Sequence, residues 1–117
     1  MTDRAPGHLS AASRRWFAEI SDAFALEAHH RRLLVLAAEC WDRGERARKV
    51  LAAEGLTYTD RRGNPRARPE NTIARDAATV FSRLVRELRL DVGLPDHAGR
   101  PPRLLEPGQH RRRNGVA

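Results

Sequence analysis

Apolar residues recur at helical spacing near the start of the chain. Trp16, Ile20 and Phe24 follow one another at intervals of four residues, and Ser10 and Ser13 stand ahead of them. The side chain of either serine can accept a hydrogen bond from a first-turn backbone N–H that would otherwise lack a partner. The pattern predicts a helix over residues 10–24.

A second, longer helical pattern runs over residues 28–54 and stops before Gly55, which is expected to take a left-handed conformation at the helix end. Within it, four consecutive apolar residues sweep about 300° of the helix circumference, more than one apolar face accounts for. We expect another copy of the protein to supply part of the cover. The alternative is a helix that is central in its own small fold. The candidate residues for an interface between copies are Leu33, Val35 and Leu36.

The segment after Gly55 changes character. Residues 56–59 are β-branched and aromatic, residues 60–64 have the composition of a turn, and residues 65–68 can pair back as an arginine-bearing strand. These features predict a short β-hairpin, in which Pro65 is confined to an edge because it has no backbone N–H to donate.

A third helix is predicted over residues 70–90. Pro69 suits the first turn of a helix, and the following apolar residues recur at steps of four, three, one, three and four. These apolar residues are Ile73, Ala77, Val80, Phe81, Leu84 and Leu88. The spacing is that of an amphipathic helix with a polar face rich in arginine.

The fold class that follows is mainly α. It comprises an antiparallel helical hairpin, a short β-hairpin, a third amphipathic helix and a disordered basic C-terminal tail rich in proline and glycine. The expected divisions are a flexible N-terminus over residues 1–9, a helical domain over residues 10–92 and the tail over residues 93–117. We expect the first helix to pack on the second and bury most of the apolar surface through Trp16, Ile20, Leu34, Trp41 and Leu51.

Positive charge is concentrated in the second half of the chain. Residues 1–55 hold nine basic and eight acidic groups, a net charge of +1. Residues 56–117 hold thirteen basic and seven acidic groups, a net charge of +6 of the total +7. All but one of the basic residues are arginine, whose planar guanidinium suits phosphate contact. The alternative is a solvated basic face. The residues predicted to bind DNA are Arg61, Arg62, Arg66, Arg68, Arg111, Arg112 and Arg113.

Catalytic, metal-binding and cofactor-binding patterns are absent from the sequence. Lys49, the only lysine, follows no glycine-rich phosphate-binding loop. His29 and His30 are adjacent, so on a helix their side chains should diverge by about 100° and not share one metal ion. Cys40 is the only cysteine, which rules out an intramolecular disulfide. We therefore predict a protein that is not an enzyme and has no cofactor and no metal site.

The sequence also predicts a cytoplasmic protein. No apolar run approaches the roughly 18 residues that span a bilayer. The N-terminus, with Asp3, Arg4 and Pro6, lacks the apolar core of a secretory signal.

The order and spacing of several short motifs resemble one phage terminase small-subunit family over residues 8–92. The motifs are Trp16-Phe17 before Ile20, Leu33-Leu34 through Ala37-Ala38-Glu39-Cys40-Trp41-Asp42, Gly55-Leu56-Thr57, Asp60-Arg61-Arg62-Gly63-Asn64, Arg68-Pro69 and Arg86-Glu87-Leu88-Arg89-Leu90. Members typically read His-Pro or Asn-Pro before the third helix and Leu-Gly-Leu at its end. Here Arg68-Pro69 and Leu88-Arg89-Leu90 stand in those places.

The resemblance implies a helical protomer that assembles into a ring and recognises the packaging-initiation region of double-stranded viral DNA. It further implies that the protomer recruits or regulates the large terminase subunit, which carries the ATPase and nuclease, in the cytoplasm of the bacterial host. Two other functions stay open from the residues alone. One is a small helix-turn-helix-like regulator, with its turn within residues 24–28, and the other is a helical adaptor that does not bind DNA.

Overall fold

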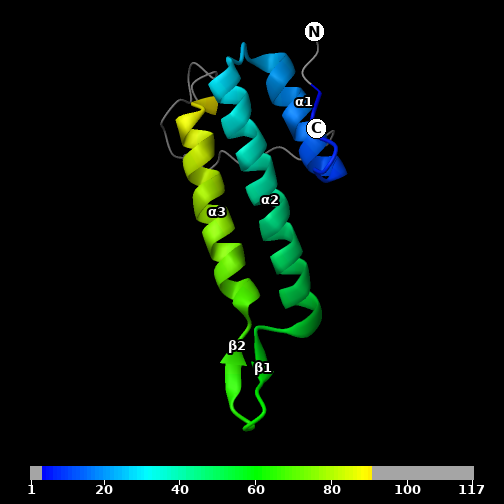
Figure 1. The fold of residues 1–117 in the computed structure, drawn as a ribbon, viewed down its shortest axis with the longest axis vertical. Helices are drawn as coiled ribbons and strands as arrows, with labels where there is room; N and C mark the ends of the chain where they lie inside the picture. Colours follow the sequence, from blue (N-terminus) through cyan, green and yellow to red (C-terminus); the bar gives the residue numbers. More distant parts are fainter. Residues whose placement is uncertain (1–3, 91–117) are drawn as a thin grey trace, which may run out of the picture.

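The computed structural model describes residues 4–90 of the 117. It confirms the mainly α fold with a short antiparallel β-hairpin, and Figure 1 shows the chain passing up α1, down α2 and, after the hairpin, back up α3. The predicted tail, including Arg111, Arg112 and Arg113, lies outside the described residues. The elements are α1 (Ala11–Ala23), α2 (Ala28–Glu54), β1 (Thr57–Thr59), β2 (Pro65–Ala67) and α3 (Pro69–Glu87).

The start of α2 and the end of α2 are set by different devices. At the start, the Glu27 side chain accepts a hydrogen bond from the backbone of His30, while Glu27 N donates to His30 Nδ1 over 3.2 Å. At the end, Gly55 has φ +86° and ψ 176°. The predicted positive φ is confirmed, but ψ is extended rather than left-handed helical. This conformation is essentially restricted to glycine.

Helix α3 ends three residues before the predicted boundary. Leu88 N donates to Leu84 O, but Arg89 N reaches only as far back as Arg86 O, at 3.0 Å. Arg89 has φ +54°, the left-handed region that residues with a Cβ rarely adopt. The helix therefore stops at a change in the backbone conformation of Arg89, which a pattern of apolar residues does not reveal.

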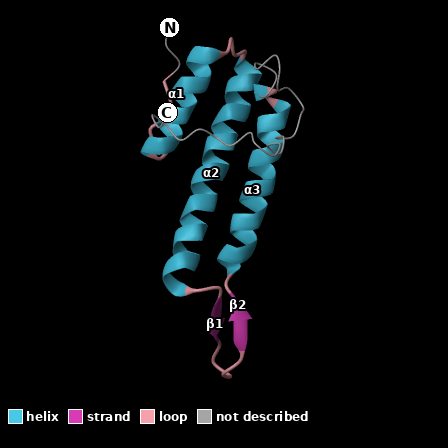
Figure 2. Cartoon of the chain, turned by 180° about the vertical axis from the view of Figure 1, so that it is seen from behind, coloured by secondary structure: helices cyan, strands magenta, loops and turns pink. Residues whose placement is uncertain are grey.

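Helices α2 and α3 form the most extensive helix pair, whereas α1 lies along only the first half of α2 (Figure 2). The contact between α2 and α3 is lined by small residues. Gly44 of α2 is buried, and a Cβ placed on it would lie 3.3 Å from the Cβ of Ala77 in α3. Such small side chains let two helix backbones approach closely. The expectation that packing of α1 on α2 buries most of the apolar surface is wrong, because the longer contact is between α2 and α3.

An aromatic cluster joins all three helices. The ring of Phe81, from α3, lies between Trp16 of α1 and Trp41 of α2, with ring centroids 5.6 Å and 5.2 Å apart. These rings border an open apolar pocket of about 260 Å³. Leu34 is fully buried as expected, but Trp41 borders the open pocket and keeps 43% of its surface exposed.

A buried carboxylate fastens the start of α1 to α2. Asp42 is 6% exposed and accepts hydrogen bonds from Ser10 N at 2.8 Å, Ser10 Oγ at 2.7 Å and Ser13 Oγ at 2.6 Å. Ser10 Oγ in turn accepts from Ser13 N, as predicted for the capping residue. Burial alone would raise the pKa of Asp42, but the hydrogen bonds from Ser13 and Ser10, together with the nearby charge of Arg46, hold it below its ordinary value of 3.8.

The segment before α1 also contacts α2. Leu9 is buried, and His8 Nε2 lies 2.7 Å from Glu39 Oε2. Within residues 4–90, no helix combines the length and the apolar composition needed to cross a membrane.

Candidate nucleic-acid interface

The β-hairpin extends beyond the ends of α2 and α3 (Figure 1). Its strands pair antiparallel, with Thr57 opposite Ala67, Tyr58 opposite Arg66 and Thr59 opposite Pro65. Every residue of both strands is exposed. No described helix covers either face of the hairpin, so an external partner can approach it from either side.

The turn of the hairpin is organised by Asp60. Its Oδ1 accepts hydrogen bonds from the backbone N–H groups of Asn64 and Arg62, each at 2.9 Å, and Gly63 supplies the positive φ that the turn requires. The Asn64 hydrogen bond, followed by that from Arg66, lowers the pKa of Asp60 below its ordinary value, and the Arg62 N–H adds to this against a small opposing effect of desolvation. The ionised carboxylate therefore fixes the loop that presents Arg61 and Arg62.

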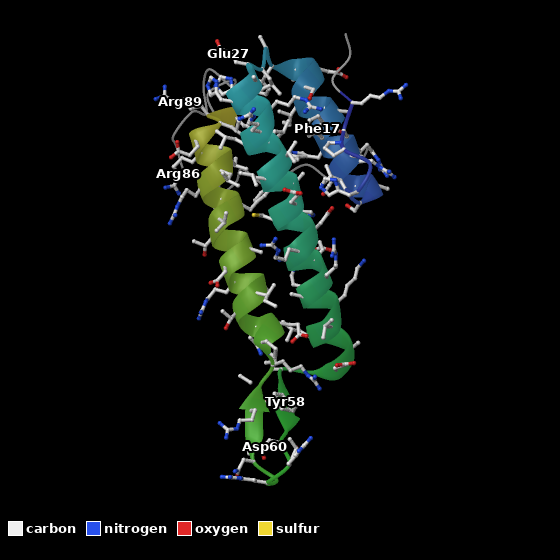
Figure 3. The ribbon with its side chains drawn as sticks, viewed as in Figure 1. Phe17, Glu27, Tyr58, Asp60, Arg86 and Arg89 are labelled. Carbon is white, nitrogen blue, oxygen red and sulfur yellow. The ribbon has the colours of Figure 1, made fainter. Side chains whose placement is uncertain are left out.

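The four hairpin arginines differ in their contacts with acidic side chains. Arg61 and Arg62 are exposed at the turn, and neither has an acidic partner among residues 4–90. Arg66 Nε lies 3.0 Å from Asp60 Oδ2, so its charge is partly balanced within the hairpin. The structure thus brings three of the predicted DNA-binding residues together in the hairpin, whose turn residue Asp60 lies at one end of the molecule (Figure 3).

Arg68, the fourth predicted DNA-binding arginine, contacts the protein itself. Its Nη1 lies 3.2 Å from Glu54 Oε2, its guanidinium stacks 6.0 Å from the ring centroid of Tyr58, and its side chain is 23% exposed. Arg68 N also donates to Leu56 O, which accepts a second hydrogen bond from Asn71 Nδ2 at 2.8 Å. Arg68 therefore joins the hairpin to the end of α2.

The sequence reasoning missed the supporting residues of this site. Asp60 and Asn64 were assigned only to a turn, although an aspartate in a turn commonly accepts a hydrogen bond from the backbone N–H two residues later, as Asp60 does from Arg62. Asn71 and Tyr58 carried no such signal. Their roles depend on contacts at the base of the hairpin, where Asn71 Nδ2 donates to Leu56 O and the Arg68 guanidinium lies over the Tyr58 ring.

The predicted interface between copies is partly accessible. Leu36 is 49% exposed, whereas Leu33 and Val35 are half-buried and Leu34 is fully buried. Among the described residues, the four consecutive apolar positions are therefore covered on most sides within one chain. Leu36 is the member that this chain leaves open.

The prediction that the side chains of His29 and His30 diverge is wrong. The rings of His29 and His30 have centroids 4.0 Å apart, and with Glu27 they place three ligand-type atoms within 4.8 Å of one another. However, His30 Nδ1 already accepts the Glu27 N–H, and the positive end of the α2 dipole lies beside the group. The absence of a metal site stays a prediction.

Comparison with known proteins gives one family. The family described as "Phage terminase, small subunit" matches residues 14–92, about two-thirds of the chain. No curated protein and no solved structure matches the chain. The matched region covers α2, the hairpin and α3 in full and begins within α1. The chain belongs to the phage terminase small-subunit family.

Proposed function

We propose that this protein binds double-stranded viral DNA at the packaging-initiation region through the turn of its hairpin. The family implies a role in phage DNA packaging, and its members are generally non-catalytic. The observation that carries the proposal is the position of Arg61 and Arg62. They project from a turn that Asp60 holds in one conformation, at the end of the molecule, without acidic partners in the described part of the chain.

The physical basis of binding is electrostatic. Guanidinium groups that contact phosphates displace condensed counterions from DNA, which makes the affinity fall steeply with salt. A two-stranded β-ribbon is also narrow enough to enter the major groove. Arg66 can add to the contact when it exchanges its partner Asp60 for a phosphate. Arg68 is held to Glu54 and acts by positioning the hairpin. The tail residues Arg111, Arg112 and Arg113 remain part of the proposal as further phosphate contacts.

The proposal includes a homo-oligomeric ring that recruits or regulates the large terminase subunit in the bacterial cytoplasm. Leu36 is the central candidate for the contact between copies, with Leu33 and Val35 beside it, because a half-exposed leucine on a helix is favourably covered by a second chain. In a ring, a weak DNA contact on each copy is repeated, and the combined affinity exceeds that of one copy.

The test is DNA binding by Arg61→Glu/Arg62→Glu against a matched control, Arg14→Glu/Arg15→Glu. The control reverses two exposed arginines on α1. We expect the hairpin variant to lose at least tenfold in duplex affinity and to show a flatter salt dependence, while the control keeps both. Light scattering on a sizing column should give one closed oligomer for all three proteins. Equal loss in both variants would indicate a general charge effect and would refute the hairpin as the site.

The helix-turn-helix alternative receives no specific support from the geometry. That motif crosses its two helices at a wide angle, whereas α1 and α2 run antiparallel side by side (Figures 1 and 2). A dimer with sequence-specific binding would nevertheless favour it. An adaptor without DNA affinity would be recognised by wild-type protein that binds no duplex at any salt concentration.

A further inference from the structure

Three exposed arginines share the outer face of α3. Arg75 and Arg86 are eleven residues apart, so they lie within about 20° of each other around the helix, and Arg83 lies about 60° from Arg86. All three are exposed. The buried Ala77 is on the opposite side of the helix, facing α2. The arginines therefore line the outer edge of the molecule.

Acidic and large apolar side chains are missing between these arginines. The intervening positions on this face are Thr72, Thr79 and Ser82. The hydroxyls of Thr79 and Ser82 donate to backbone carbonyls one turn earlier, at 3.1 Å and 2.9 Å, so the side-chain donors that remain for an external ligand are those of Thr72 and the arginines.

The acids nearest this face, Asp76 and Glu87, lie on its Arg83 side, and neither forms an ion pair with Arg83 or Arg86 in the described residues. Asp76 approaches Arg75 only to 3.8 Å between Oδ1 and Nε, and both side chains are mostly exposed. Arg83 and Arg86 have no acidic partner within residues 4–90. The exposed Ile73 and Val80 lie on the same flank as Asp76, outside the arc of the arginines. The face is consequently basic and polar without an apolar centre.

A fourth arginine stands at the end of this row in an unfavourable backbone conformation. Arg89 has φ +54°, which for a residue with a Cβ costs about 1 kcal/mol or more relative to glycine. Figure 3 shows Arg86 and Arg89 at the same end of α3, on the side away from α1. Strained non-glycine residues of this kind concentrate at functional sites.

We propose that this face, formed by Arg75, Arg83, Arg86 and Arg89 and called the α3 arginine edge, binds the phosphate backbone of duplex DNA. It rests on the proposed DNA-binding function and extends the contact from the hairpin along the length of α3. Arg75 and Arg86 are separated by about 17 Å along the helix axis. A duplex presents one phosphate charge per roughly 1.7 Å of axis, so DNA laid along the edge meets several phosphates.

A protein partner is less well matched to the α3 arginine edge than DNA. Stable protein interfaces have an apolar, water-excluding centre with a polar rim. The edge offers arginines separated by hydroxyl groups, the kind of surface that contacts a sugar-phosphate backbone. Since α3 begins at Pro69, directly after β2, the edge and the hairpin arginines can follow one duplex.

The experiment compares the full-length protein with Arg75→Gln/Arg83→Gln/Arg86→Gln and with a control, Arg14→Gln/Arg15→Gln/Arg43→Gln. The control removes the same charge from three exposed arginines of α1 and α2. Fluorescence anisotropy with a labelled 30-base-pair duplex, titrated at several salt concentrations, gives the slope of log affinity against log salt. Loss of three phosphate contacts should reduce the magnitude of this slope by about 2.7. The control should keep the wild-type slope.

The outcomes separate this inference from the proposed function. Wild-type slope and affinity in the edge variant, together with weakened binding by Arg61→Gln/Arg62→Gln, would overturn the edge alone. An edge variant that binds DNA normally but loses the large terminase subunit would also overturn it and make the face a protein-docking surface. No duplex binding by the wild-type protein would overturn both. Circular dichroism and native mass must match the wild type, since α3 also packs on α2.

Discussion

Replacement of Asp42 by alanine should detach α1 from α2. The change removes the acceptor of three hydrogen bonds, those from Ser10 N, Ser10 Oγ and Ser13 Oγ. Ser10 is exposed, so water can replace its lost partner, but Ser13 is 3% exposed and its hydroxyl would be left without an acceptor. Hydrogen bonds to charged groups contribute about 1.5–3 kcal/mol each, and a buried orphan costs about 1–3 kcal/mol. Allowing for water at Ser10, we expect a loss of about 2–4 kcal/mol in the free energy of unfolding.

The assays are urea unfolding and amide hydrogen exchange. Exchange should accelerate most in α1, at Ser13 and along the helix that follows it, because the contact that docks the start of α1 on α2 is removed. Asp22→Ala is the matched control, since Asp22 is an exposed carboxylate on α1, the helix that Asp42 fastens to α2. Asp42→Asn, which keeps one carbonyl acceptor, should fall between the two. A loss below about 1 kcal/mol, or one equal to that of Asp22→Ala, would refute the reasoning.

The effect of Asp42 should also depend on pH. The folded protein holds the pKa of Asp42 below the ordinary 3.8, so ionised Asp42 stabilises the fold above that value. Its contribution is lost as the pH falls through the lower, folded pKa. The difference between the wild type and Asp42→Ala should therefore be constant at neutral pH and shrink below about pH 4. A difference that persists unchanged in acid would mean that the hydrogen bonds do not depend on the charge.

Two further predictions concern the backbone and the helix seam. Arg89→Gly should raise the free energy of unfolding by about 0.5–1 kcal/mol, because it relieves the left-handed conformation at φ +54°, whereas Arg86→Gly, within α3, should lower it by about 1 kcal/mol. Thermal and urea unfolding check both, and a loss in the first would contradict the strain argument. Gly44→Leu should destabilise by about 1–3 kcal/mol, because even a Cβ at this position lies 3.3 Å from Ala77 Cβ. In the same urea assay the exposed Ala53→Leu should change stability by less than about 0.5 kcal/mol.

The helical framework was predictable because it depends on local patterns. Ser10 was one of two predicted capping residues, residues 28–54 were predicted as one helix, and Gly55 was predicted to follow its end. Each prediction follows from backbone hydrogen bonding that neighbouring residues determine. The partners of the helices were less predictable. Trp41 was assigned to a contact with α1, but its ring packs on Phe81 of α3, 40 residues later in the sequence. A single sequence does not specify which apolar faces meet.

The candidate site was predictable in its charge but not in its arrangement. The concentration of arginine in the second half of the chain predicted that the hairpin arginines bind DNA. Arg61 and Arg62 lie exposed at the turn, where a partner can reach them. The different position of Arg68, which is packed on Tyr58 and paired with Glu54, depends on the way the base of the hairpin meets the end of α2. The apolar spacing placed the arginines of α3 on the polar face of that helix. The structure adds that the opposite face, at Ala77, packs on α2, so the arginines lie on the outside of the molecule.

The open edges of the β-hairpin have a consequence for molecules that gather at high local concentration. A two-stranded sheet leaves unpaired backbone groups along both outer edges, and such edges readily pair with strands of other chains. Here each strand has only three residues, Pro65 lacks an N–H, and Arg61 and Arg62 give neighbouring hairpins the same charge. The like charges of Arg61 and Arg62 therefore oppose edge-to-edge pairing between hairpins of separate molecules. Substitution of both arginines by an uncharged residue weakens this repulsion.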